Sequence, residues 1–134
     1  MKTLIQILTV IIILLLQSTN VDAQARLTIE NQSMRTMTVK VMKGYGDGGS
    51  LHKTVNISAY GSETIYFSES GYYYTKTKAV YVGKEPVYQK GEAFQVTNDR
   101  TGYSIMTLTF SITETATPQI TGGEEISKQE FDKN

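Results

Sequence analysis

Few residues in this sequence could carry out catalysis. His52 is the one histidine among 134 residues, and cysteine is absent. A zinc site built from several histidines and a thiol nucleophile are therefore both excluded. The segment from Gly102 to Met106 departs from the serine-hydrolase pattern G-x-S-x-G at its last position. We therefore predict a solvent-facing His52 and no catalytic residue.

Paired carboxylates are the remaining route to catalysis. Glu63 and Glu69 flank one predicted strand, and Glu85 and Glu92 flank another. Glycosidases hold two such groups about 5 to 9.5 Å apart across the bond they cleave. All four glutamates fall at turns or strand ends, where charged side chains are simply solvated. A non-catalytic protein is therefore the prediction, and a small carboxylate-dependent hydrolase is the alternative.

A glycine-rich segment at positions 44–49, GYGDGG, satisfies the pattern G-x-G-x-x-G. The phosphate-binding form of this pattern needs a strand before it and a helix after it, because the helix N-terminus holds the anion. Here the residues that follow, from Leu51 to Ile57, have a strand pattern. We predict a glycine hairpin at this position, and we predict neither a cofactor nor a metal site.

Three consecutive tyrosines, followed by two lysines at alternate positions, occupy residues 72–78. Alternate side chains of a strand share a face, so one face holds Tyr72, Tyr74, Lys76 and Lys78. The other face holds Tyr73, Thr75, Thr77, Ala79 and Tyr81. Burying two lysines costs free energy. We therefore expect the second face to pack on the core and the first face to be exposed.

Exposed tyrosines beside polar groups suit the recognition of a sugar or a protein, because tyrosine combines a rigid apolar ring with a polar tip. The candidate binding surface is Tyr72, Tyr74, Lys76 and Lys78. Tyrosine is also favoured in strands generally, where it packs against cross-strand neighbours. The tyrosine segment thus has two interpretations, a recognition surface for an unknown protein or glycan, or ordinary sheet stabilisation.

The elements that position these residues are predicted to be strands. From Arg26 to Thr113 the apolar residues alternate with polar ones, and turn residues recur every eight to twelve positions. The predicted strands cover residues 26–30, 37–42, 51–57, 65–67, 72–81, 87–89, 94–96 and 105–113. We therefore expect an all-β fold, a single antiparallel β-sandwich of seven or eight strands with immunoglobulin-like architecture. A small β-barrel is the alternative, and exposed strand edges could make the protein an assembly subunit.

The segments outside these strands divide the chain into three parts. Residues 1–23 have a short basic start, an apolar stretch from Leu4 to Leu16, and small residues at Val21-Asp22-Ala23, as signal peptides do. Cleavage after Ala25 and an uncleaved anchor are the alternatives. Residues 24–115 would form the β-sandwich domain. Residues 116–134 are acidic and poor in apolar residues, so they are expected to be a flexible tail.

Composition limits the location and the partners. Cleavage after Ala23 leaves 111 residues with 12 basic and 12 acidic side chains, so the mature protein is formally neutral. Nucleic-acid binding usually needs a basic footprint, and none is predicted here. Small secreted domains often depend on disulfides, and a chain without cysteine favours a bacterial secreted or periplasmic protein. We expect no stable membrane insertion after cleavage.

Overall fold

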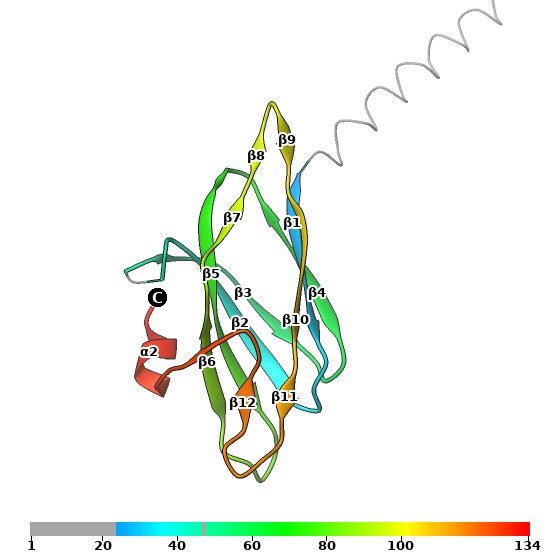
Figure 1. Ribbon diagram of the computed structural model, residues 1–134, viewed down its shortest axis with the longest axis vertical. Helices are drawn as coiled ribbons and strands as arrows, with labels where there is room; N and C mark the ends of the chain where they lie inside the picture. Colours follow the sequence, from blue (N-terminus) through cyan, green and yellow to red (C-terminus); the bar gives the residue numbers. More distant parts are fainter. Residues whose placement is uncertain (1–23, 47) are drawn as a thin grey trace, which may run out of the picture.

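The computed structural model describes residues 24–46 and 48–134, which form two facing β-sheets (Figure 1). The predicted signal peptide, residues 1–23, lies outside the described residues. Within the described ranges, no helix has the length and apolar character needed to cross a membrane.

The larger sheet has six strands, in the order β13-β6-β5-β2-β3, with β7 pairing to the other end of β5. Its strands are β2 (Thr36–Lys43), β3 (Ser50–Ile57), β5 (Gly71–Val80), β6 (Val87–Gly91), β7 (Phe94–Val96) and β13 (Gly123–Glu125). Every pairing within it is antiparallel. The register places Lys40 of β2 opposite Lys76 of β5, and Lys76 opposite Lys90 of β6. Three lysines therefore lie side by side across the sheet.

The smaller sheet has three strands, in the order β10-β1-β4. These are β1 (Ala25–Asn31), β4 (Ser62–Phe67) and β10 (Ile105–Phe110). β1 is antiparallel to β4 but parallel to β10. Parallel neighbours need a long connection, and here most of the domain lies between them. β10 is an edge strand of this sheet.

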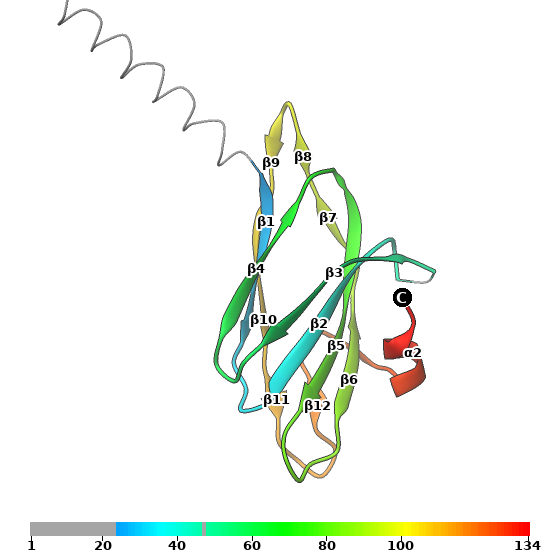
Figure 2. The same ribbon diagram turned by 180° about the vertical axis from the view of Figure 1, so that it is seen from behind.

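Short elements complete the fold at its two ends. β8 (Asn98–Asp99) and β9 (Gly102–Tyr103) form a small hairpin at one end, and β11 (Ile112–Thr113) pairs with β12 (Gln119–Ile120) at the other. The helix α2 (Lys128–Asp132) lies on the outer side of the six-stranded sheet, away from β1, β4 and β10 (Figure 2). Its N-cap is Ser127, whose hydroxyl accepts a hydrogen bond from the Glu130 amide (3.1 Å).

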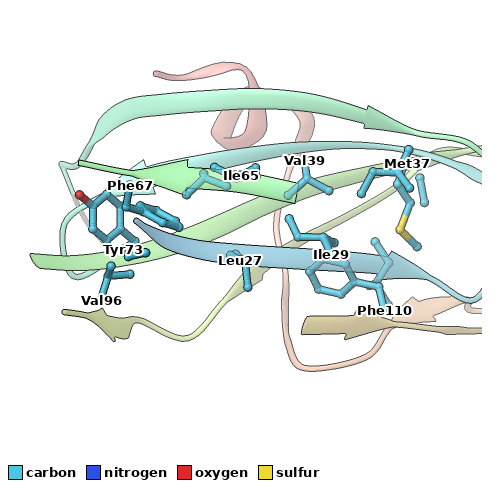
Figure 3. Close-up of a cluster of buried hydrophobic side chains, with 14 of the residues drawn as sticks. Leu27, Ile29, Met37, Val39, Ile65, Phe67, Tyr73, Val96 and Phe110 are labelled. Carbon is cyan, nitrogen blue, oxygen red and sulfur yellow. The ribbon is translucent and has the colours of Figure 1, made fainter. Parts of the chain in front are cut away.

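The core lies between the two sheets, where the inward side chains of both interdigitate (Figure 3). Its members follow the period-two pattern of the strands: Leu27 and Ile29 on β1, Met37, Val39 and Val41 on β2, Ile65 and Phe67 on β4, Tyr73 and Ala79 on β5, and Phe110 on β10. This alternation is the local signal that predicts the strands.

The prediction of an all-β sandwich is confirmed. Within residues 24–46 and 48–134 the sheets do not close into a barrel, so the barrel alternative is not the architecture that forms. Each predicted strand coincides with an observed strand, although the last is divided into β10 and β11. The parallel pairing of β1 with β10 departs from the purely antiparallel sandwich that we expected.

The C-terminal segment differs from the expected flexible tail. It contributes β12 and β13 to the pairing and then forms α2. Two of its few apolar side chains, Ile120 and Phe131, are each 5% exposed. The segment is ordered because it packs on a surface that the folded sheet supplies, and composition alone does not reveal that surface.

An ion pair between the buried Arg35 and the partly exposed Glu114 joins the segment between β1 and β2 to the residue after β11. Arg35 is 1% exposed, and its Nε and Nη2 donate to the two carboxylate oxygens of Glu114 at 2.7 and 3.2 Å. Its Nη1 donates to the Glu85 carbonyl at 2.8 Å. The Arg35 hydrogen bonds are the main reason that the pKa of Glu114 falls from 4.5 to about 2, and Lys84 adds to the effect. A bidentate pair of this kind fixes direction as well as distance.

Replacing Glu114 tests this ion pair. Because the pKa of Glu114 is lower in the folded protein than in the unfolded chain, its stabilisation is complete above pH 4.5 and is lost as the pH falls toward 2. We expect Glu114→Gln to lower the free energy of unfolding at pH 7 and to flatten its dependence on pH between 5 and 2.5, as measured by urea denaturation. The control is Glu63→Gln, whose side chain is exposed. An unchanged pH dependence in Glu114→Gln would show that the pair contributes nothing.

Candidate functional site

The four residues of the predicted binding surface do not form one exposed surface. Tyr72 is exposed (39%) and Lys78 is half-buried, but Tyr74 and Lys76 are 3% and 2% exposed. The expected exposure of Tyr74 and Lys76 is therefore wrong. The opposite face was predicted correctly to pack on the core at Tyr73, Thr75, Thr77 and Ala79, whereas Tyr81, at 47%, is exposed.

The glycine-rich loop between β2 and β3 buries Tyr74. A Cβ atom at Gly49 would lie 2.8 Å from the Tyr74 hydroxyl, so the loop backbone rests directly on this ring. Gly44, Gly46 and Gly48 have φ angles of 137°, 127° and 66°, a region that favours glycine. The prediction of a hairpin is confirmed, since β3 follows directly and no helix begins here.

The C-terminal helix buries Lys76. Its ammonium group donates to the Glu130 carbonyl at 2.8 Å and to the Lys133 carbonyl. The neighbouring Lys40 donates to the Phe131 carbonyl and to Asn134 Oδ1, both at 2.9 Å. Cations at the carbonyl end of a helix are favoured by its dipole and by its unpaired carbonyls. Two lysines thus hold the last turn of α2 on the sheet.

Packing and charge complement these hydrogen bonds. The Phe131 ring centroid lies 4.7 Å from the Lys40 ammonium and 5.6 Å from the Tyr88 ring. Burial lowers the pKa of Lys76 from 10.5, and the nearby charge of Lys40 lowers it further. The segment 116–134 carries four acidic and two basic residues. Its acidic character therefore matches the lysines that it covers.

Two tyrosine rings remain exposed beside this covered region. Tyr45, at the start of the glycine-rich loop, is 75% exposed and stacks on Tyr72 with 4.6 Å between ring centroids and 29° between ring planes. The Gly44 amide donates to the Tyr72 carbonyl at 2.8 Å, which fixes the loop next to β5. Among the ring contacts of the described residues, this is the pair in which both rings are exposed.

A cavity of about 720 Å³ has Tyr45, one ring of the stacked pair, in its wall. Its wall includes Tyr45, Gly46, Lys90, Glu92, Gly123 and Glu124. β6 and β13 supply the floor, because Glu124 pairs with Lys90 across these strands and Gly123 with Gly91. Lys90 Nζ lies 3.4 Å from Glu124 Oε1 and donates to the Gly46 carbonyl at 3.2 Å. Lys90 therefore connects the glycine-rich loop to the C-terminal segment.

The glutamate pairs considered in the sequence do not converge. Glu63 and Glu69 lie toward opposite ends of β4, and Glu85 and Glu92 lie beyond opposite ends of β6. The length of β6 alone is about 13 Å at 3.3 Å per residue, beyond the separation that glycosidases use. Instead Glu92 shares the cavity with Glu124, and both side chains are exposed.

His52 is exposed, as predicted. Its ring stacks on Phe67 with 4.9 Å between centroids, and Nε2 lies 3.0 Å from the Tyr66 carbonyl. No group of three or more potential metal-ligating side chains occurs among the described residues.

Sequence reasoning found Tyr72 but missed Tyr45 and the cavity. Tyr45 lies in a segment without strand periodicity, and the one available signal was a single aromatic residue among glycines. The wall formed by Gly123 and Glu124 could not be found, because their segment was expected to be flexible.

Comparisons with protein-family models, with curated proteins and with solved structures found no match to this chain.

Replacing Lys76 tests how the C-terminal segment is held. Lys76→Met removes the donor to the carbonyls of Glu130 and Lys133, so the segment should open more often. We expect faster hydrogen–deuterium exchange in peptides covering residues 119–134, and no such change in Lys53→Met, which alters an exposed lysine on β3. Exchange as slow as in the unmodified protein would mean that the Lys76 ammonium does not hold the segment.

Proposed function

We propose that this protein is a non-catalytic recognition module that acts outside the cytoplasm, in the periplasm or as a secreted protein. The observation that carries the proposal is the exposed Tyr45–Tyr72 stack at the rim of a cavity. The pattern of residues 1–23 supports export.

The stacked tyrosines have the properties of a contact surface. Each ring offers apolar area with few rotatable bonds, so little conformational entropy is lost when a partner binds. Their stacking orders both rings before a partner arrives, which further reduces that entropy loss. The outer face of the sheet beside them is covered by α2 and the glycine-rich loop. Tyr60, Tyr66, Tyr81 and Tyr103 are also exposed, but among the described residues no ring contact joins any two of them.

The geometry favours binding over catalysis. A glycosidase acid is typically kept protonated by burial in an apolar pocket, and the two carboxylates that share the cavity are both exposed. Glu124 is in addition paired with Lys90. His52 packs on Phe67, and its Nε2 lies within hydrogen-bond distance of the Tyr66 carbonyl. These structural contacts account for the histidine, so a catalytic role is not needed to explain it.

Removing the stacked rings tests this proposal. Residues 24–134, immobilised and exposed to envelope and polysaccharide extracts of the source organism, should retain a partner that the double variant Tyr45→Ala/Tyr72→Ala loses. The matched control is Tyr103→Ala, since Tyr103 is 43% exposed and lies on β9. Circular dichroism and the melting temperature establish that each variant folds. Equal retention by the double variant and the unmodified protein would contradict the assignment of the site.

A second candidate function, assembly through a strand edge, is favoured by the open edge of β10. The Arg26 amide donates to the Ser104 carbonyl, and the Gln32 amide donates to the Phe110 carbonyl. These bonds show that the backbone groups of the even-numbered residues of β10 face β1. In a parallel ladder the backbone groups of Ile105, Thr107 and Thr109 then face away from β1. No strand of the described ranges pairs with that side of β10.

An apolar pocket of about 380 Å³ lies beside this edge. Leu27, Phe94, Met106, Leu108 and Phe110 contribute to its wall. A second copy of the chain could pair its β10 antiparallel to this one about a two-fold axis, because Thr107 lies near the middle of the edge. The threonines would then meet across the pair on the outer face.

The state of association tests this second candidate. If β10 edges pair, the mass measured by light scattering should rise with concentration toward a dimer. Thr107→Pro should keep the protein monomeric, because it removes an edge donor without removing a bond to β1. The control is Thr107→Ser, which keeps the backbone amide and should still associate. A mass that stays monomeric at every concentration would exclude this assembly.

A further inference from the structure

The chemistry of the cavity wall limits the ligand that could fill it. Among the described residues that line it, Tyr45 provides the large apolar surface, and no branched or long aliphatic side chain contributes. Lipids and peptides with large apolar side chains need such a lining to exclude water. The cavity therefore does not suit them, in contrast to the apolar pocket beside β10.

The charges of the wall argue against a polyanion. Glu92 and Glu124 contribute two carboxylates, and Lys90 contributes one ammonium group. That ammonium group already contacts Glu124 at 3.4 Å and the Gly46 carbonyl at 3.2 Å. Phosphate-rich and sulfated chains bind through surplus positive charge, and the described residues of the wall carry no such surplus.

The wall instead offers many hydrogen-bonding groups around one ring. Several of its residues are glycines, of which Gly91 and Gly123 are paired across β6 and β13. The two carboxylates, when ionised, accept hydrogen bonds from hydroxyl groups strongly. Close packing also requires glycine at two of these positions. A Cβ atom at Gly91 would lie 2.8 Å from Thr75 Oγ1, and one at Gly123 would lie 2.7 Å from Gln89 Nε2. Its volume of about 720 Å³ is within the range of pockets that enclose small ligands.

We propose that this cavity binds a neutral carbohydrate chain, with a sugar ring stacked on Tyr45 and sugar hydroxyls donating to Glu92 and Glu124. A sugar has one apolar face of C–H groups and a rim of hydroxyls, which matches a tyrosine ring beside carboxylates. This inference rests on the proposed recognition function and adds the class of ligand. Binding of this kind depends little on salt, because no net charge is neutralised.

Affinity electrophoresis with defined polysaccharides tests the inference. The probes are mannan, xylan, mixed-linkage β-glucan and chitin oligosaccharides, with dextran sulfate as the anionic comparison. We expect at least one neutral probe to bind residues 24–134 equally at 50 and 500 mM salt. Tyr45→Ala should weaken that binding about tenfold, Glu92→Gln should weaken it several-fold, and Tyr103→Ala should not.

Two outcomes would overturn the inference. Binding of dextran sulfate alone, with loss at high salt, would mean a polyanion site. Absence of Tyr45-dependent binding to every neutral probe would exclude the carbohydrate assignment. Carbohydrate binding could fail while the unmodified protein captures a protein from the extract that the Tyr45→Ala/Tyr72→Ala variant does not. The recognition function would then stand, with a protein as its partner. Release of reducing ends from a bound probe would instead contradict the non-catalytic function.

Discussion

The buried ammonium group of Lys76 determines where the C-terminal segment lies. A charge without water around it must be hydrogen-bonded, and the carbonyls of Glu130 and Lys133 at the end of α2 supply those bonds. The segment is thereby held across the outer face of the six-stranded sheet, with β13 beside β6. Gly123 and Glu124 then become part of the cavity wall. The proposed site thus depends on a contact between residues more than fifty positions apart in the chain.

The strands could be predicted from the sequence because their signal is local. Leu27 and Ile29, or Met106 and Leu108, alternate with polar neighbours, and a period of two identifies a strand wherever its partner lies. The same rule correctly placed Tyr73, Thr75, Thr77 and Ala79 on the inner face of β5. It could not give the parallel pairing of β1 with β10, which depends on how distant segments meet.

The site was only partly predictable, because exposure is a property of the whole fold. Two lysines on one face of β5 led to the prediction that this face is exposed to solvent. A long lysine side chain can also donate hydrogen bonds to the carbonyls at the end of a helix, as Lys76 does. The segment 116–134 has too few apolar residues for an independent fold, but on the folded sheet Phe131 packs against Tyr88 and Lys40, adding to the Lys76 hydrogen bonds and the β13–β6 pairing. Tyr45 gave no periodic signal, since glycines on both sides set its position through their backbone conformation.

Carbohydrate binding at the cavity is measured most directly by two-dimensional NMR. Residues 24–134, labelled with ¹⁵N, are titrated with an oligosaccharide of a neutral polysaccharide that binds in electrophoresis. The amide shifts should concentrate at residues 44–46, 48–49, 72, 90–93 and 122–124, around the tyrosine stack and the cavity. Shifts confined to residues 105–110 along the open edge of β10, with none near Tyr45, would contradict binding at the cavity.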